Sequence, residues 1–374
     1  MAHRAGGDVV SVVGEAKPEV SAEARRSEVQ PRLVGLGTAV PNMCMEQSEI
    51  AARLAAVWGL RGPQLRLWQR IIAGTAIDTR CAVMPVEEVV TLSTGARMEV
   101  YERHAPALAE RAVVGALDRG GIEPGRVTDL IVVSCTGFWA PGLDVALVER
   151  LGLPATVRRT VIGFMGCFGA IIGLRAAVGV CGADPGAVAV VVCLELCSLH
   201  LRSDRGAENL VASALFGDGA AAAVVCGARV ARAADGPSLG SLTMGHSRLL
   251  SEGRDWMSWR ITDTGFAMTL TRDVPAALAS RLGAIVEEVC PRRLGCYVVH
   301  PGGAGILDAV DQGLQLEGRS GLDAARSTLR RYGNMSSATL LFVLAEAFRR
   351  GYRPPAMLLA FGPGLAVEMM VLYR

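Results

Sequence analysis

Lysine is almost absent from this chain: Lys17 is the only one among its 374 residues, and it lies near the N-terminus. A lysine that forms a Schiff base with a carbonyl substrate is therefore excluded from the folded body. The same absence excludes a phosphate-binding loop of the Walker type, which requires a lysine after its glycines. Two common kinds of active site are thus removed before any motif is considered.

Long hydrophobic runs are also lacking. A membrane-spanning helix needs ~18 consecutive apolar residues, whereas the longest apolar candidate, 187–194, is soon closed by Glu195. Residues 1–30 have neither the charged start nor the apolar segment of a secretory signal, and we predict that they form a flexible tail. We accordingly expect a cytoplasmic protein without a membrane span.

The sequence has no strong excess of one charge and no closely paired cysteines. Its formal net charge is +2, and no basic run is interleaved with aromatic residues, so nucleic acid is not an expected partner. The ten cysteines form no CxxC pair, which argues against a zinc site and against a disulfide framework. We expect reduced thiols that are mostly buried in apolar runs.

Apolar side chains are abundant. Hydrophobic residues make up 51% of the chain and charged residues 20%, which is typical of a compact globular protein with one large domain or two fused ones. Short apolar runs alternate with segments of helical period, and this alternation predicts an α/β layered fold. Strands are predicted at 32–41, 129–137, 158–166, 187–196, 220–228, 295–301, 355–362 and 366–374. Helices are predicted near 92–119, 143–151, 168–182, 275–289, 303–314, 321–331 and 335–350.

The two halves of the sequence have a similar local pattern. "LIVVSCTG" (130–137) and "YVVHPGG" (297–303) are each an apolar strand that ends in a polar residue and glycine before a helix. This similarity suggests two related lobes, 31–230 and 231–374, that meet near the loop-like segment 228–240.

Three short stretches combine glycine with a reactive side chain: "MGCFGA" with Cys167, "VVHPGGAG" with His300 and "YGNMSSAT" with Asn334. A thiol at a helix N-terminus feels the positive end of the helix dipole, so we expect a thiol pKa lowered from about 8.5 towards neutrality. A neighbouring imidazolium would lower that pKa further. The backbone N–H of Cys167 would be available as a donor to an oxyanion.

The other two residues have complementary chemistry. His300 is expected at the tip of a strand, and Asn334 at the start of a helix, where its amide is free to donate hydrogen bonds. Taken singly, each of the three residues also has a structural interpretation, as a buried thiol, a strand-end histidine and a helix cap. Sequence spacing alone does not bring them together in space.

Five motifs in order along the chain carry a family resemblance: "GCFGA" (166–170), "ALFGDGAAA" (214–222), "HPGGAGILD" (300–308), "YGNMSSA" (332–338) and "FGPGLAVE" (361–368). They resemble the motifs of type III polyketide synthases, the chalcone synthase superfamily, and the match runs from about residue 32 to 374. The resemblance implies a thiolase fold of two similar lobes with five α-β-α-β-α layers, and a homodimer. It also implies a catalytic triad of Cys167, His300 and Asn334.

The family chemistry agrees with these side chains. The resemblance implies that Cys167 takes an acyl group from a coenzyme A thioester and that malonyl-CoA then loses carbon dioxide to give an enolate, which attacks the acyl-enzyme. His300 Nε2 and Asn334 would donate hydrogen bonds to the thioester oxygen of malonyl-CoA. Coenzyme A thioesters are then the substrates, and neither a metal, a redox cofactor nor an acyl carrier protein is required.

The resemblance also assigns pocket residues. Phe216 matches a gatekeeper phenylalanine, although it is also compatible with an ordinary core position, and a second gatekeeper position falls on Met268. Phe266 lies on the same strand face as Met268 by alternation. Cys135, Cys197 and His200 replace threonines of the plant enzymes, Trp259 replaces a glycine, Ala140 replaces a methionine that crosses the dimer, and Glu195 completes the predicted pocket.

These replacements argue against a chalcone-type product. "CTGFWAPGLD" (135–144) and "ELCSLH" (195–200) look like bacterial members that make alkylpyrones and alkylresorcinols from fatty acyl starters. We therefore expect a medium- to long-chain acyl-CoA starter, with room for its tail beside Cys135. A synthase that uses malonyl-CoA alone to make a hydroxynaphthalene is the alternative.

Contacts to coenzyme A are predicted at Arg70, from the "LWQR" match, and at the backbone of Gly305. The neighbouring lysine positions of the family are Leu67 and Gly74 here, so the usual basic cluster is thinned. Arg66 and Arg80 are candidates to replace it, and a solvated surface charge is the alternative for each.

Two other classes of protein remain as alternatives. A ketoacyl synthase III of fatty-acid synthesis shares the triad but takes malonyl from an acyl carrier protein, and "GNMSSAT" with "FGPG" favours the polyketide family over it. A scaffold that has lost its chemistry would lack a member of the triad, and all three are present.

Overall fold

The computed structural model describes residues 30–233, 238–291, 294–316 and 320–374. The tail predicted for residues 1–30 therefore lies, except for its last residue, outside the described residues. In the described part of the chain, no helix is long and apolar enough to cross a bilayer.

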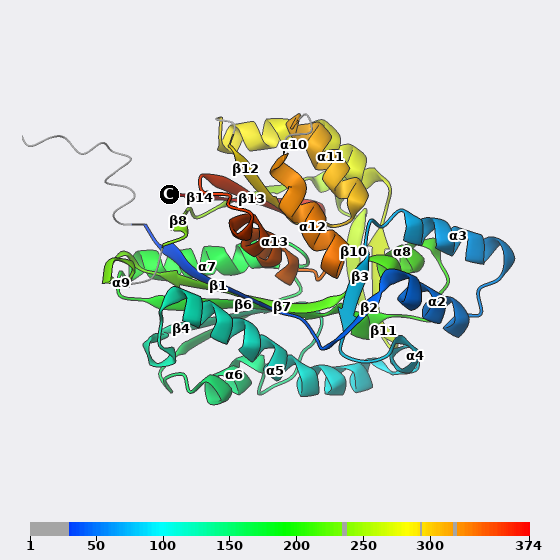
Figure 1. Cartoon of the computed structure of the whole chain (residues 1–374), viewed down its shortest axis with the longest axis horizontal. Helices are drawn as coiled ribbons and strands as arrows, with labels where there is room; N and C mark the ends of the chain where they lie inside the picture. The colour runs from blue at the N-terminus through cyan, green and yellow to red at the C-terminus, as the bar shows by residue number, and fades with distance from the viewer. Residues whose placement is uncertain (1–29, 234–237, 292–293, 317–319) are drawn as a thin grey trace, which may run out of the picture.

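A large mixed sheet forms the framework of the molecule (Figure 1). Its strands run in the order β12-β13-β14-β8-β1-β7-β6-β4-β5, and β9 pairs separately with β14. The short strand β8 joins the two halves of the sheet, because it pairs with β1 on one side and with β14 on the other. The bounds are β1 Arg32–Ala39, β4 Asp129–Ser134, β5 Arg158–Gly163, β6 Val188–Leu196, β7 Asp218–Cys226, β8 Gly240–Leu242, β9 His246–Leu249, β12 Cys296–Val299, β13 Ala356–Gly362 and β14 Ala366–Tyr373.

The helices form layers on and between the halves of this sheet. Two apolar helices, α7 (Gly169–Ala183) and α13 (Ala338–Arg349), lie in the centre and contact strands from both halves. On one outer side α5 (Thr94–Gly120) and α6 (Leu143–Leu151) cover the sheet, and on the other lie α10 (Asp273–Val289) and α11 (Ala304–Leu314), with α12 (Asp323–Tyr332) between α11 and α13 (Figure 1). This arrangement of layers is the predicted thiolase fold.

Strand β6 shows why the layers form. All nine of its residues are buried, and successive side chains point to opposite faces. Val188, Val190 and Val192 belong to the core shared with α5, whereas Ala189, Val191 and Cys193 belong to the core around α7 and α13. A strand that is apolar on both faces must be covered on both, which fixes it between two layers of helices.

All eight predicted strands and all seven predicted helices are present, with ends that differ by a few residues. The missed elements are short or half-exposed. They are β2 Met43–Glu46, β3 Thr79–Ala82, β10 Met257–Thr262, β11 Gly265–Leu270, α2 Gln47–Val57, α3 Gly62–Ala73, α4 Val86–Val89, α8 Ala207–Leu215 and α9 Ala228–Ala233, together with β8 and β9.

The expectation that every cysteine is a reduced thiol was wrong. Cys44 and Cys81 form a disulfide. They are direct partners in the antiparallel pair of β2 and β3, and this pairing brings two residues 37 positions apart to a Cα–Cα distance of 4.0 Å. The other eight cysteines are not in disulfides.

Candidate active site

Cys167 lies in the sharp turn between β5 and α7, two residues before the first helical residue. Phe164 and Gly166 have positive φ angles of 56° and 80°, so the chain reverses just before the cysteine. Gly166 cannot be replaced easily, because a Cβ there would lie 2.3 Å from Cδ of Pro363. The "GFMGCFG" and "FGPG" motifs therefore pack against each other, and this contact fixes the position of the thiol.

His300 follows directly on β12, as predicted for a strand tip. Its backbone N–H donates to the carbonyl of Leu359 on the neighbouring strand β13 at 2.8 Å. Its side chain is 1% exposed, and within the described structure neither ring nitrogen has a hydrogen-bond partner. Buried polar atoms normally have partners, so an imidazole with two free nitrogens indicates a place for a substrate.

Asn334 lies in the turn between α12 and α13, not at the first position of the helix. Its backbone N–H donates to the carbonyl of Leu215, and its carbonyl accepts from the N–H of Gly217, both at 2.9 Å. These bonds bracket Phe216, which forms an isolated parallel bridge with Asn334. The predicted gatekeeper and the predicted hydrogen-bond donor are thus held to each other by the backbone.

The carboxamide of Asn334 has a defined orientation. Its Oδ1 accepts a hydrogen bond from the backbone N–H of Ser336 at 2.8 Å, which assigns the other end of the amide as the Nδ2 donor. That donor has a long bond of 3.4 Å to the carbonyl of Gly302, and the side chain of Asn334 also bonds to the thiol of Cys167. The amide therefore points towards the sulfur, where a substrate would be held.

Cys167, His300 and Asn334 meet in one small pocket of about 30 Å³. The three residues come from separate parts of the chain, and the structure brings together the three glycine-rich motifs. The predicted gate residues Phe216 and Met268 also line this pocket. The remaining lining residues are Leu215, Met257, Leu270, Gly302, Ile306 and Phe361.

The electrostatics differ from the expectation of a low thiol pKa. Burial raises the pKa of Cys167 to about 12, although hydrogen bonds from the side chains of Ser336 and Asn334 act in the opposite direction. Burial also lowers the pKa of His300 to about 3. Burial away from water raises the thiol pKa more than the helix N-terminus lowers it. Before substrate binds, Cys167 is therefore a neutral thiol and His300 a neutral imidazole.

Glu195 does not line the pocket as predicted, because its side chain is completely buried. Its carboxylate accepts hydrogen bonds from Thr136 Oγ1 at 2.7 Å, from the N–H of Cys135 at 3.0 Å and from Ser337 Oγ at 2.5 Å. Burial raises its pKa to about 7. Glu195 thus ties the loop after β4 to the start of α13, directly behind the catalytic pocket.

Cys135 and Cys197 are buried near Cys167 but are not among the residues that line its pocket. Cys135 Sγ accepts a hydrogen bond from the N–H of Gly166 at 3.1 Å, so it supports the turn that carries Cys167. Burial raises the pKa of both Cys135 and Cys197 well above the ordinary value for a thiol.

The other predicted pocket residues form an aromatic cluster next to Phe216. The ring of His200 stacks on Phe266 with centroids 3.7 Å apart, and Trp259 meets Phe216 edge-on at 5.7 Å. Trp259 also contacts His200 and Phe266 edge-on, at 6.4 and 6.1 Å. We call His200, Phe216, Trp259 and Phe266 the aromatic wall of the pocket.

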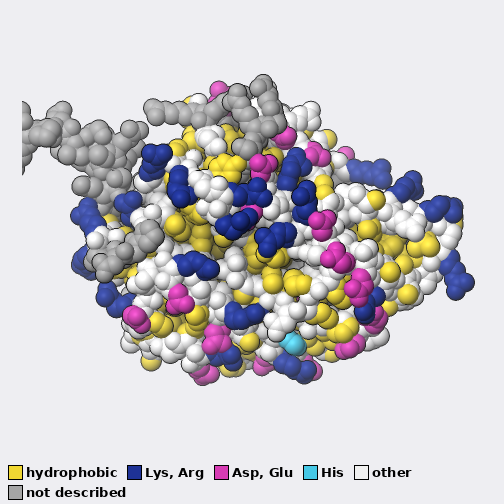
Figure 2. All heavy atoms as spheres, in the orientation of Figure 1, with side chains coloured by type: hydrophobic (Ala, Val, Ile, Leu, Met, Phe, Trp, Pro, Cys, Tyr) yellow, Lys and Arg dark blue, Asp and Glu magenta, His cyan; other side chains and the backbone are white. Residues whose placement is uncertain are grey.

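The predicted contacts to coenzyme A lie outside this wall. Gly305 is exposed in the first turn of α11, between Gly302 and Ile306 of the pocket lining. Arg70 is exposed on α3, whose end of the molecule carries several basic side chains (Figure 2). Arg80 is not available to coenzyme A, because its side chain is buried and bonded to the protein itself.

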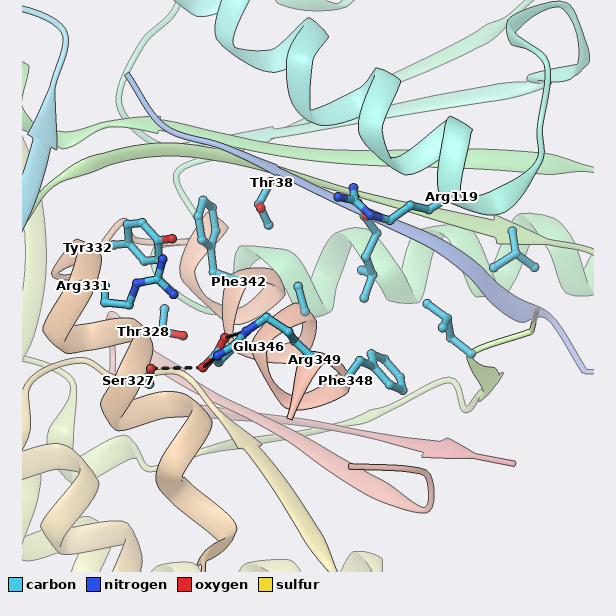
Figure 3. Close-up of a pocket in the computed structure, with 14 residues that line it drawn as sticks. Thr38, Arg119, Ser327, Thr328, Arg331, Tyr332, Phe342, Glu346, Phe348 and Arg349 are labelled. Atoms are coloured by element: carbon cyan, nitrogen blue, oxygen red, sulfur yellow. Dashed lines mark hydrogen bonds and ion pairs between the residues drawn. The ribbon is translucent and has the colours of Figure 1, made fainter. Parts of the chain in front are cut away.

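A larger cavity, of about 570 Å³, lies elsewhere, between β1, the end of α5, α12 and α13 (Figure 3). None of the predicted site residues lines it. Among the residues that the structure describes, no group of three or more His, Cys, Asp or Glu side chains is placed to hold a metal ion.

Sequence reasoning missed several residues that support the site. Ser336 and Ser337 lie inside the "YGNMSSA" motif and orient Asn334 and Glu195, so a signal for them was present. Thr136 and the structural role of Arg80 have no local signal, because their side-chain partners are 33 to 136 positions away in the chain.

A buried cysteine before a central helix, a strand-end histidine and an oriented asparagine amide, in one pocket of a thiolase fold, define a condensing enzyme that transfers acyl groups. Family models agree with this class. The chalcone and stilbene synthase N-terminal domain matches residues 19–229, and the C-terminal domain of the same family matches residues 241–374. The chain belongs to the chalcone and stilbene synthase family, the type III polyketide synthases.

Bacterial relatives have similar sequences over almost their whole length. A 1,3,6,8-tetrahydroxynaphthalene synthase of Streptomyces peucetius is 33% identical over 345 residues, which is 90% of this chain and 91% of the relative. An alpha-pyrone synthesis polyketide synthase-like protein of Mycobacterium tuberculosis, Pks18, is 31% identical over 358 residues, 90% of this chain and 89% of the relative.

Solved structures of the same class are also similar. A polyketide synthase of the brown alga Ectocarpus siliculosus has a TM-score of 0.84 at 28% identity, over 92% of this chain and 98% of its own. The C-terminal type III polyketide synthase domain of Steely1 from Dictyostelium has a TM-score of 0.85 at 26% identity, over 92% of this chain and 99% of its own.

Proposed function

We propose that Cys167 carries the growing acyl chain, and that His300 and Asn334 stabilise the enolate formed from malonyl-CoA. One observation carries this assignment: the three side chains share a single buried pocket in which the imidazole nitrogens have no hydrogen-bond partner among the described residues and the amide of Asn334 points towards the Cys167 sulfur. Donors held in a dry pocket, aimed at an oxygen that becomes negative, are the strongest electrostatic contribution available to such a reaction.

The steps follow from these positions. The Cys167 thiol attacks the thioester carbonyl of an acyl-CoA, its proton passes to His300, and coenzyme A leaves with a proton. Because burial raises the pKa of the thiol to about 12, the resting thiol needs this proton acceptor. Malonyl-CoA then loses carbon dioxide, and the electron pair of the broken bond moves into the enolate, whose oxygen accepts hydrogen bonds from His300 and Asn334. The enolate carbon attacks the acyl-enzyme and expels the Cys167 thiolate.

The aromatic wall favours a small starter over a long one. The pocket of about 30 Å³ is lined by Phe216, behind which Trp259 packs, and has little room for an alkyl tail. A malonyl unit is the smaller of the two starters, and a tetrahydroxynaphthalene synthase is among the relatives. The long-chain starter predicted from the sequence agrees with the alpha-pyrone relative, but it would require Trp259 or Met268 to move.

A homodimer is part of the proposal. Strand β5 ends the sheet with an unpaired edge, and Val161, Phe164 and the nearby Phe138 are 61%, 38% and 42% exposed. An open edge with apolar side chains is normally covered, and a second copy of the chain would cover it by pairing its own β5. Coenzyme A esters are the proposed substrates, without an acyl carrier protein, and a cytoplasmic location stays a prediction.

A panel of coenzyme A esters tests the proposal. The protein is incubated with malonyl-CoA alone, and with malonyl-CoA plus acyl-CoAs of two to sixteen carbons, and products are identified by mass. A hydroxynaphthalene from malonyl-CoA alone would support the small starter, and alkylpyrones or alkylresorcinols from long acyl-CoAs would reject it. Activity only with malonyl on an acyl carrier protein would instead assign a ketoacyl synthase III.

A further inference from the structure

Among the arginines that the structure describes, two are buried inside the protein, and one of them lies next to the pocket. Arg80, on β3, is 4% exposed. Its Nη1 donates to the carbonyl of Phe216 at 2.6 Å and to the carbonyl of Ser213 at 2.8 Å. Its Nε donates to Gln47 Oε1 at 2.7 Å. A charged side chain is costly to bury, so its bonds to backbone carbonyls indicate a specific task.

The segment that Arg80 holds is the one that reaches the pocket. Ser213 is in the last turn of α8, and Phe216 follows the end of this helix. The Phe216 segment is in turn bonded to Asn334 through the N–H groups of Gly217 and Asn334. The stem of Arg80 also packs under Gly333, where an added Cβ would lie 3.0 Å from its Cγ and Cδ. One side chain therefore supports the backbone of both the gate and the enolate donor.

Arg80 and Gln47 are themselves anchored at the strand pair β2 and β3, which the Cys44–Cys81 disulfide links. Gln47, the first residue of α2, follows β2 directly, and Arg80 precedes Cys81 on β3. Gln47 Nε2 donates to the carbonyl of Ala214 at 2.8 Å, so Gln47 and Arg80 together hold three backbone carbonyls in the last turn of α8 and just after it. Among the described residues, the side chains of Arg80 and Gln47 form no hydrogen bond with Cys167 or His300, whose positions depend on other elements.

We infer that Arg80 is a positioning residue that holds Phe216 and Asn334 in place for the decarboxylation of malonyl-CoA. This inference rests on the proposed function. Because Arg80 contacts Phe216 and Gly333, the residues that hold Asn334, but does not bond to the turn of Cys167, its loss should separate the two half-reactions: acylation of Cys167 should persist, and enolate formation should fall.

The test compares Arg80→Met with the wild type in two assays. Acylation of Cys167 by hexanoyl-CoA is followed by intact mass, and release of carbon dioxide from malonyl-CoA is followed separately. We expect acylation within about threefold of the wild-type rate and decarboxylation lower by about tenfold or more, which corresponds to ~1.4 kcal/mol of activation free energy. Arg80→Lys keeps a charge and a donor and should recover part of the decarboxylation rate.

Arg97→Met is the matched control. Arg97 is the other buried arginine of the described chain, is 0% exposed, and likewise donates to backbone carbonyls, those of Leu92, Leu199 and Leu201. The last two flank His200 of the aromatic wall, and none of the three belongs to the Phe216 or Asn334 segments. Its loss should lower the melting temperature without changing the ratio of decarboxylation to acylation.

Each outcome bears on one of the two claims. Equal losses of both half-reactions in folded Arg80→Met, or unchanged decarboxylation, would overturn the positioning role while leaving the proposed function intact. A wild-type protein that neither becomes acylated nor releases carbon dioxide would refute the proposed function and this inference with it. If Arg80→Met does not fold, Arg80→Lys and Gln47→Leu carry the same comparison of half-reactions.

Discussion

The pocket has two sides that are built differently. On the catalytic side, Cys167, His300 and Asn334 are positioned by backbone turns and by buried hydrogen bonds behind them. The side chains of the aromatic wall on the other side are held mainly by ring packing: His200 Nε2 bonds to the carbonyl of Thr136 at 2.8 Å, whereas Trp259 Nε1 and His200 Nδ1 have no partner among the described atoms. Polar networks allow few alternatives, whereas packed rings tolerate changes of similar volume. The difference suggests that one side fixes the chemistry and the other sets the size of the substrate.

The largest effect is expected from removal of the thiol. Cys167→Ala should abolish the covalent acyl-enzyme with every acyl-CoA, because no other cysteine lines the pocket. Intact mass spectrometry after incubation with acyl-CoA measures the acyl adduct directly. Cys135→Ala is the control, since Cys135 is buried nearby without lining the pocket, and it should keep the adduct. An adduct of full occupancy on the Cys167→Ala protein would show that the nucleophile has been assigned wrongly.

Replacing the amide donor should have the next largest effect. Asn334→Ala should lower the rate of malonyl-CoA decarboxylation by about 10²–10³, the usual loss when one donor to a developing oxyanion is removed. Asn334→Asp tests the hydrogen-bond donor without changing the orientation of the side chain. An aspartate still accepts from the N–H of Ser336 but has no N–H to donate to the enolate. A decarboxylation rate in Asn334→Asp close to that of the wild type would mean that donation by Nδ2 is not needed.

Substitutions in the aromatic wall should change the preference among starter acyl-CoAs more than they change the overall rate of the reaction. Trp259→Ala opens space next to Phe216, so long acyl-CoA starters should gain relative to malonyl-CoA by about tenfold in kcat/KM, a gain of the size that a few buried methylenes can give. The measurement is a competition between decanoyl-CoA and malonyl-CoA as starters. Trp259→Phe, which keeps most of the volume, should stay close to the wild type. Identical starter preferences in all three proteins would show that this wall does not limit the chain.

The difference between the two sides of the pocket also explains which of their residues and strands could be predicted from the sequence. Cys167, His300 and Asn334 stand in glycine-rich motifs, and buried strands such as β6 read as apolar runs, so both could be found locally. The strands β10 and β11 of the aromatic wall are half-exposed and of mixed polarity, and they were missed.

Long-range effects could not be read from local patterns. The pKa of Cys167 rises because tertiary packing removes water, which the helix-terminus argument did not include. The Cys44–Cys81 disulfide joins residues 37 positions apart, and no short motif marks such a pair.

The smallest effect is expected from Glu195, whose hydrogen bonds to Thr136 and Ser337 support the segments next to the Cys167 pocket. Burial raises the pKa of Glu195 from 4.5 to about 7, so the folded state binds a proton that the unfolded chain releases at a lower pH. The stabilisation is therefore complete below pH 4.5 and is lost as the pH rises through about 7. Glu195→Gln keeps the shape of the group and cannot ionise. From pH 4.5 to 8, the wild type should lose ~1–3 kcal/mol of unfolding free energy relative to this variant. Urea unfolding of both proteins at several pH values measures the difference. A constant difference across this range would mean that Glu195 titrates as an ordinary carboxyl group, and that the hydrogen bonds from Thr136 and Ser337 offset the cost of burying its charge.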